Sequence, residues 1–199
     1  MTDQLIIAVS REFGSGGHFI AEQLAKTFQI PFYDRNLLWE LANERNLDIS
    51  ALTKYDEVPK RRLLSRKVRG FNNSPEENIA RLQFDYLKKK AAEGESFVVV
   101  GRCAETVLRD HPALISVFIL ADEQSKLERI CRLNNLSPDE AAAMIARCNK
   151  QRKAYHNYYC PVKWGDSRGY DLCINDSRLG VDGTAAFIEQ YIRKRFPQL

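Results

Sequence analysis

The chain has 199 residues, of which 44% are hydrophobic and 28% are charged. This length and composition indicate a globular protein with a single α/β core, and they exclude disordered, collagen-like and coiled-coil chains. The 30 basic and 26 acidic residues give a formal net charge of +4. Such a mild charge suits an anionic small-molecule substrate, or simple solubility, and does not require a nucleic-acid partner.

Targeting and cysteine patterns are also informative. The first residues lack the basic start and long apolar core of a secretion signal. No run approaches the roughly 18 to 20 apolar residues of a membrane span. The five cysteines form no Cys-x-x-Cys pair and have no histidine nearby at ligand spacing, so neither a zinc site nor a disulfide framework is indicated: Cys103, Cys131, Cys148, Cys160 and Cys173. We therefore expect a reduced, cytoplasmic protein with no membrane partner.

Short apolar segments alternate with longer helix-like segments along the chain. In order, the patterns predict a strand at 5–9, a helix at 17–28, a short strand at 31–33, helices at 35–44 and 75–92, a strand at 97–100, a helix at 104–110, a strand at 114–120, helices at 123–134 and 138–155, a strand at 170–174 and a helix at 181–196. Continuously apolar strands between helices are typical of a doubly wound parallel sheet with right-handed βαβ connections.

Two further segments carry local signals. Ser137-Pro138-Asp139-Glu140 has the pattern of a capping box, which predicts a helix that begins at Pro138. The segment 48–74 has weak periodicity and carries a basic run from Lys60 to Arg69. We interpret it as a substrate-side excursion from the core, and a solvated basic surface is the alternative.

A glycine-rich turn, Ser10 to His18, stands directly between the first strand and the first helix. Among the four residues from Gly14 to Gly17, three are glycine and the other is Ser15. Glycines expose successive backbone N–H groups, and the following helix adds its positive end, so the turn predicts a phosphate site. An ordinary tight turn between strand and helix is the alternative.

The turn departs from a standard Walker A motif, because no lysine follows the last glycine. His18 and Phe19 stand where the phosphate-binding lysine and the magnesium-binding hydroxyl are expected. If the site transfers phosphate, another cation must neutralise the charge on the transferred group. Arg11 is the first candidate and His18 the second.

Taken together, these motifs resemble the cytidylate kinase-like family, a branch of the nucleoside-monophosphate kinase group with the P-loop fold. The resemblance runs nearly end to end, through the segments 10–17, 31–34, 99–102, 117–121, 152–155, 164–166 and 170–175. It implies a three-layer α/β/α fold in one domain over residues 1–199, with a five-stranded parallel sheet. The core would comprise 1–47 and 94–199, the monophosphate-binding excursion about 48–93 and the lid region about 135–168.

The resemblance also implies roles for single residues. The turn from Gly14 to His18 would hold the phosphates of ATP or GTP with Mg²⁺, whose protein ligands the sequence leaves open. Arg102 matches the arginine that holds the acceptor monophosphate, and Asp34 is a second acceptor-side candidate, at a strand end where such sheets bind ligands. Cys103 stands where the family motif has an aspartate, which a thiol cannot replace as a charged acceptor.

The lid is predicted around Arg147 to Arg152. Asn149 replaces the aspartate of the family motif, whereas Arg152 is retained, and Arg132 and Arg147 are further basic candidates. Converging arginines bind phosphate well because their fork-shaped donors match its oxygens. Trp164 is the aromatic residue that we expect to stack on a base.

Three hypotheses remain open at this point. The first is a small-molecule kinase in which Arg11, His18, Arg102 and Arg152 stabilise the transferred phosphate and whose partners are nucleotides. The second is a catalytically degenerate nucleotide-binding or regulatory protein on a kinase fold, which the missing lysine and the changes at Cys103 and Asn149 favour. The third, a nucleic-acid-binding module built on the basic run, lacks any recognisable reading motif. The oligomeric state is not predicted.

Overall fold

The computed structural model of the chain describes residues 4–34, 36–45, 67–68, 71–72 and 74–198. At its centre is a five-stranded parallel sheet with the strand order β2-β5-β1-β6-β7. The strands are β1 (Ile6–Arg11), β2 (Phe32–Tyr33), β5 (Phe97–Val100), β6 (Leu114–Leu120) and β7 (Leu172–Asn175). The predicted doubly wound parallel sheet is confirmed, and β1 is its central strand.

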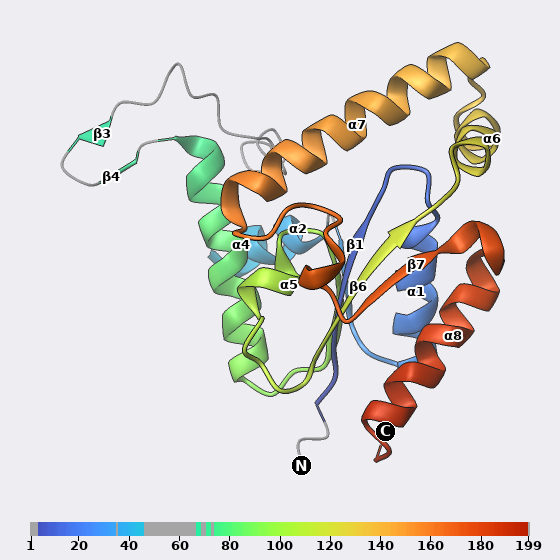
Figure 1. Cartoon of the computed structure of the whole chain (residues 1–199). Coiled ribbons are helices and arrows are strands. Elements are labelled where there is room, and N and C mark those ends of the chain that lie inside the picture. Colours follow the sequence, from blue (N-terminus) through green and yellow to red (C-terminus); the bar gives the residue numbers. More distant parts are fainter. Residues whose placement is uncertain (1–3, 35, 46–66, 69–70, 73, 199) are drawn as a thin grey trace.

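Helices cover both faces of the sheet (Figure 1). One face carries α1 (Gly17–Phe28) and α8 (Gly180–Arg195), and the other carries α2 (Leu37–Arg45), α4 (Pro75–Ala92) and α5 (Ala104–Val107). After β6 come α6 (Glu123–Asn134) and α7 (Pro138–Tyr159), and α7 crosses the carboxyl end of the sheet toward α4. The remaining elements are short: the hairpin strands β3 (Lys67–Val68) and β4 (Phe71–Asn72), and the 3₁₀ turns η1 (Ser167–Gly169) and η2 (Asp176–Arg178).

The central strands are buried on both faces because successive side chains point in opposite directions. Ile6 and Ala8 of β1 pack in the core beneath α2, α4 and α5. Ile7 and Val9 pack in the core beneath α1 and α8. The continuously apolar runs of the sequence therefore correspond to strands that supply two separate cores at once.

Most predicted bounds hold to within a few residues, and two helices differ in length. The capping box of α7 is present, with Ser137 and Glu140 in reciprocal hydrogen bonds. That helix continues past 155 to Tyr159. It ends there because Pro161 forces the preceding residue, Cys160, into an extended conformation. The helix expected at 104–110 ends at Val107, since the chain turns there before entering β6.

The predicted excursion falls partly outside the described residues. Of its basic run from Lys60 to Arg69, only the backbone at 67 and 68, in β3, is described. Its last part is α4, which buries Ile79, Tyr86 and Leu87 in the same core as α2 and β5. This helix therefore belongs to the packed core because its apolar side chains cover one face of the sheet.

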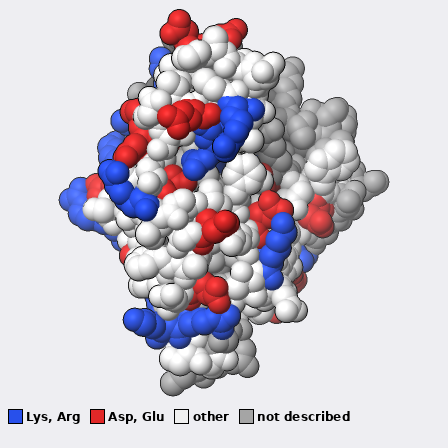
Figure 2. Space-filling model, turned by 90° about the vertical axis from the view of Figure 1, so that its right-hand side faces the viewer, with Lys and Arg blue, Asp and Glu red and all other residues white. Residues whose placement is uncertain are grey.

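Among the described residues, no helix is both long enough and apolar enough to span a membrane. Figure 2 shows one face of the molecule, on which small groups of basic and acidic side chains lie interspersed. On this face the mixed pattern is typical of a solvated surface.

Candidate functional site

The glycine-rich turn joins β1 to α1 at the carboxyl end of the central strand. Gly14 and Gly16 have φ values of 84° and 78°, in the left-handed region that residues with a Cβ rarely adopt. Gly16 is also the N-cap of α1, and the first turn of that helix contains no acidic residue. The N–H groups of a helix N-terminus favour an anion, and the first turn of α1 supplies no carboxylate of its own to compete for them.

Gly17 is required by packing rather than by its backbone angles. A Cβ at this position would lie 2.6 Å from the Cβ of Arg11, which is closer than side chains approach one another. The Arg11 side chain thus occupies the space in which a side chain at position 17 would begin. If the Walker A pattern is aligned on Gly16 rather than on Gly17, its lysine falls at position 17, where this backbone leaves no room for a side chain, and Arg11 places a cation beside the turn instead.

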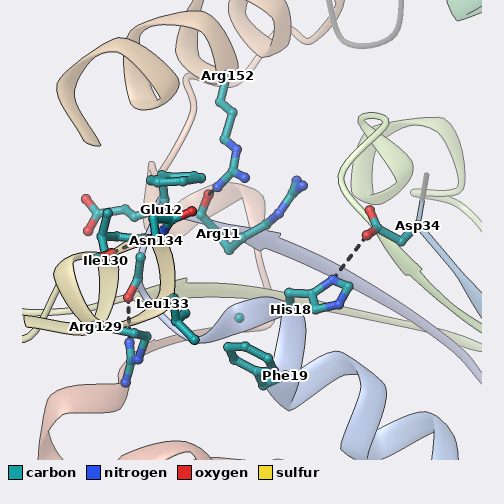
Figure 3. Close-up of a pocket in the computed structure, with 14 residues that line it drawn as sticks. Arg11, Glu12, His18, Phe19, Asp34, Arg129, Ile130, Leu133, Asn134 and Arg152 are labelled. Carbon is teal, nitrogen blue, oxygen red and sulfur yellow. Dashed lines mark hydrogen bonds and ion pairs between the residues drawn. The ribbon is translucent and has the colours of Figure 1, made fainter. Parts of the chain in front are cut away.

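A cavity of about 370 Å³ opens beside the turn (Figure 3). Arg11 extends toward the side of this cavity on which His18 and Asp34 lie, and Arg152 reaches in from α7. Seven of the predicted site residues line it: Arg11, Gly14, Gly16, Gly17, His18, Asp34 and Arg152. Ser15 is buried instead, and its hydroxyl donates to the carbonyl oxygen of Glu12 at 3.0 Å, so it supports the turn from within.

Arg129 of α6 braces the turn against the end of β7. Its Nη1 donates to the carbonyl oxygen of Gly14 at 2.5 Å, and its Nη2 donates to Oδ2 of Asp176 at 2.7 Å. Burial raises the pKa of the fully buried Asp176 carboxyl, and Arg129 opposes that rise. A Cβ at Gly16 would lie 2.7 Å from Asp176 Oδ2. The buried carboxylate therefore leaves room only for glycine there.

A second brace joins the turn to α6 through Lys126, whose side chain is 2% exposed. Its Nζ donates to Glu12 Oε2 at 2.8 Å and to Glu123 Oε1 at 2.6 Å. Burial opposes the charged amine, but these two hydrogen bonds outweigh it and raise the pKa of Lys126. Sequence reasoning did not find Lys126 or Asp176 as site residues, because neither lies in a local motif; only the tertiary fold brings them to the turn.

Asp34 lines the cavity directly after β2. Its Oδ2 is 3.1 Å from Nδ1 of His18, and its Oδ1 is 3.7 Å from Nη1 of Arg102. Burial alone would raise the pKa of this carboxyl. The hydrogen bond with His18 and the charges of Arg11 and Arg102 outweigh burial and lower it. Asp34 is therefore held ionised between two arginines and a histidine.

Arg102 follows β5, the neighbour of the central strand, on an unusual turn. Gly101, Arg102 and Cys103 have φ values of 78°, 55° and 53°. The left-handed conformation costs a residue with a Cβ about 1–2 kcal/mol, and strain of this kind gathers at functional sites. The Arg102 side chain is 1% exposed and donates from Nη1 to the carbonyl oxygen of Val100 at 3.3 Å. The fold thus holds this arginine rigidly beside Asp34.

The predicted lid residues lie on α6 and α7. Asn149 Oδ1 accepts a hydrogen bond from the backbone N–H of Phe13 at 2.7 Å, and Arg152 Nη1 donates to the carbonyl oxygen of Arg11 at 3.2 Å. These two side chains attach α7 directly to the glycine-rich turn. Arg132 and Arg147 are exposed and do not line the cavity.

A smaller cavity of about 20 Å³ adjoins the Arg102 turn, and its lining includes Arg102, Cys103, Arg152 and Trp164. Trp164 packs edge-on against Phe118, with their ring centroids 5.3 Å apart. Because Arg152 lines both cavities, it stands between the glycine-rich turn and the Arg102 turn. The structure therefore brings together most of the predicted candidates, and leaves Arg132 and Arg147 at the surface.

Comparisons with known sequences point to one family. A sequence model of the cytidylate kinase-like family matches residues 6–178. The cytidylate kinase of Thermococcus sibiricus is 27% identical over 195 residues, which cover 97% of this chain and 90% of that protein. The cytidylate kinase of Thermococcus kodakarensis is 28% identical over 190 residues, covering 94% of this chain and 88% of that protein.

Solved structures support the same fold. An uncharacterized protein from Eubacterium ventriosum superposes with a TM-score of 0.76 at 40% identity, covering 95% of this chain and 98% of that one. A shikimate kinase from Bacteroides thetaiotaomicron superposes with a TM-score of 0.56 at 14% identity, again covering 95% and 98%. The latter likeness concerns the fold alone.

Proposed function

The chain belongs to the cytidylate kinase-like family, and from this premise we propose that it transfers the γ-phosphate of ATP, or of GTP, to a nucleoside monophosphate such as CMP or dCMP. The glycine-rich turn binds the donor phosphates through its backbone N–H groups. Arg102 and Asp34, at the ends of β5 and β2, bind the acceptor.

The contact between Gly17 and Arg11 carries this proposal. A phosphate-binding turn without its lysine would suit a binding protein, but here the 2.6 Å approach to Arg11 leaves no room for a side chain at position 17. The Arg11 guanidinium lies in the same cavity and replaces the missing charge. An arginine supplies several fixed donors to phosphate oxygens, so the replacement preserves the electrostatic requirement of phosphoryl transfer.

The remaining cations act on the same charge. His18 lines the cavity next to the turn, and Arg152 lines both this cavity and the one beside Arg102. Phosphoryl transfer depends mainly on positioning and on stabilising the charge of the transferred group, and it needs no strong general base. Arg11, His18, Arg102 and Arg152 are the groups that we assign to this stabilisation.

The donor set of the cavity fits Mg²⁺. Asp34 and Glu12 are carboxylates that line it, and Mg²⁺ in such enzymes is held by one or two carboxylates together with substrate phosphates and water. When bound, the ion neutralises phosphate charge. Both carboxylates have cationic partners, Glu12 in Lys126 at 2.8 Å and Asp34 in His18 at 3.1 Å, so either would share its oxygens between that partner and the ion.

The test is a panel of acceptors assayed for release of ADP with Mg²⁺ and ATP. We expect turnover to rise when CMP, dCMP or UMP is added, and to remain at background with ATP alone. ATP binding is measured in parallel as a rise in the unfolding temperature, since a ligand that selects the folded state stabilises it.

The two measurements separate the alternatives. Thermal stabilisation by ATP with no turnover across the whole panel would contradict the kinase and support a catalytically degenerate binding protein. The nucleic-acid hypothesis predicts binding with a steep salt dependence that Lys60→Ala and Arg61→Ala reduce.

A further inference from the structure

A second cluster of reactive side chains lies behind the Arg102 turn, away from the large cavity. It consists of Glu105 on α5, His156 in the last turn of α7, and Cys160, the C-cap of α7. Their exposed fractions are 5%, 5% and 7%. None of the three lines the cavity beside the glycine-rich turn. Phosphoryl transfer, as proposed above, gives this cluster no role.

The three side chains point at one another. His156 Nε2 is 2.8 Å from Glu105 Oε1, and Cys160 Sγ is 3.8 Å from the same oxygen. One ligand atom from each residue lies within 4.8 Å of the other two, which makes this a possible metal-binding group among the described residues. The spacing of four residues between His156 and Cys160 was missed in the sequence, and the third residue, Glu105, is 51 positions from His156, so no local pattern includes it.

The buried charges of the cluster are unusual for a structural core. Burial disfavours the charged imidazole of His156, yet hydrogen bonds to Cys160 and Glu105 raise its pKa to about 9. A hydrogen bond with Cys103 lowers the pKa of the Cys160 thiol, against the effect of burial, and His156 lowers it further. The cluster therefore gathers three groups that can bear charge in a place almost closed to water.

We propose that Glu105, His156 and Cys160 bind a divalent transition-metal ion, with zinc as the preferred ion. The ion would be held by the thiolate of Cys160, the carboxylate of Glu105 and the neutral imidazole of His156, the forms in which these side chains bind metals. The two positive charges of the ion balance the thiolate and the carboxylate, so the metal-bound site is neutral. Burial of charge is costly unless it is paired in this way.

The ligand chemistry selects the ion. Thiolate and imidazole are preferred by Zn²⁺ and related transition metals, whereas Mg²⁺ and Ca²⁺ prefer oxygen ligands. Bond lengths of about 2.0–2.3 Å at tetrahedral angles place ligand atoms about 3.4–3.7 Å apart. The distance from Cys160 Sγ to Glu105 Oε1 is already 3.8 Å. His156 and Glu105 need to separate by only a fraction of an ångström.

A fourth ligand has space nearby. A cavity of about 10 Å³, lined by Glu105, His156 and Tyr170 among others, adjoins the cluster. That volume holds about one water molecule. Three protein ligands and one water complete a four-coordinate zinc site.

The position of the site suggests its consequence. Glu105 belongs to the helix that follows the Arg102 turn, and the other two ligands end the helix that carries Asn149 and Arg152. A metal ion would tie these two elements together from behind the acceptor side. It stabilises the folded state and takes no part in the chemistry.

Cobalt(II) is the probe for the test, because it occupies zinc sites and its bond to a thiolate absorbs in the near ultraviolet. The full chain is stripped with a chelator and titrated with Co²⁺ in the absence of nucleotide. We expect one equivalent per chain to produce the thiolate band, Zn²⁺ to abolish it, and Zn²⁺ to raise the unfolding temperature. Cys160→Ser should lose the band, and Cys173→Ser, which alters an exposed cysteine on β7, should keep it.

The wild-type titration decides the matter even if Cys160→Ser fails to fold. Absence of a thiolate band in the folded wild-type chain overturns the proposal, and so does a full band in folded Cys160→Ser. His156→Gln is the second variant, and we expect at least a tenfold loss of Co²⁺ affinity, since removing one group of a metal site costs about this much or more. None of these readouts depends on kinase activity, so failure of the kinase proposal leaves this test intact.

Discussion

Two turns at the carboxyl end of neighbouring strands, β1 and β5, build the candidate site by opposite means. The donor-side turn uses glycines for its left-handed positions, Gly14 and Gly16. The acceptor-side turn places Arg102 and Cys103, which both have a Cβ, in the same region of backbone space. Glycine allows a ligand to approach the backbone closely, whereas the strained turn aims a charged side chain. The first strategy is visible in the sequence, and the second is not.

The largest expected effect is the loss of the aimed charge. Arg102→Met keeps most of the volume of a side chain that is 1% exposed but removes its guanidinium. We expect kcat/KM for the acceptor to fall about 100- to 1000-fold, as when a preorganised charge-stabilising donor is removed, with ATP-induced stabilisation unchanged. Arg168→Met, at a side chain that is 85% exposed, is the control. Equal activity of the Arg102→Met and Arg168→Met variants would contradict the proposal that the turn after β5 provides the charge that acts on the acceptor.

The second effect concerns the brace of the glycine-rich turn. Arg129→Met leaves the Asp176 carboxyl buried without its cation, so we expect the free energy of unfolding to fall by about 3 kcal/mol. Adding Asp176→Asn removes the buried charge and should restore part of that loss. Chemical denaturation of the two single variants and the double variant measures this coupling. Strictly additive effects would show that Arg129 does not act through Asp176.

The third effect separates backbone strain from steric fit in the donor-side turn. Gly94 and Gly16 have similar φ values, 81° and 78°. A Cβ at Gly94 meets nothing within 4 Å, whereas one at Gly16 meets Asp176 at 2.7 Å. Gly94→Ala should therefore cost only the left-handed strain, about 1 kcal/mol, and Gly16→Ala about 1–2 kcal/mol more. We also expect only Gly16→Ala to abolish ATP-induced stabilisation. Similar losses of folding stability in the two variants would contradict the steric explanation.

The smallest effect concerns Asp34. Its pKa is lower in the folded state than the ordinary value of 3.8. The ionised carboxyl therefore contributes stability above about pH 4, and this contribution disappears as the pH falls through the folded-state pKa. In Asp34→Asn the loss of stability between about pH 6 and about pH 3 should be smaller than in the wild type, by less than about 1 kcal/mol. Denaturation curves at the two pH values test this. An equal loss of stability in Asp34→Asn and in the wild type would show that the ion pairs of Asp34 with Arg102 and His18 do not cause the loss.

Most of the fold could be predicted from the sequence because its signals are local. The apolar run from Ile6 to Val9 requires burial on two faces, and the capping box at Ser137 marks the start of α7. The end of that helix was less predictable. Pro161 stops it, but the preceding residues have no periodicity strong enough to separate helix from loop, and burial of Tyr155 and His156 carries it on to Tyr159.

The candidate site was only partly predictable. Arg11, His18 and Asp34 were found because each adjoins a strand end or the glycine-rich turn, and the fold places all three in one cavity. Arg132 and Arg147 were candidates on helix spacing alone, yet both side chains are exposed and outside that cavity. Spacing along a helix defines which residues share a face, but it does not define which face meets the ligand.

The sequence by itself determined the parallel sheet and the glycine-rich turn from Gly14 to Gly17 between β1 and α1, because strand burial and glycine φ angles depend on neighbouring residues. Only the tertiary structure decided what surrounds that turn. Arg11 excludes a side chain at Gly17, and Asp176 does the same at Gly16 from 160 positions away along the chain. Such contacts between distant residues are set by how helices pack on the sheet, and no local pattern encodes them.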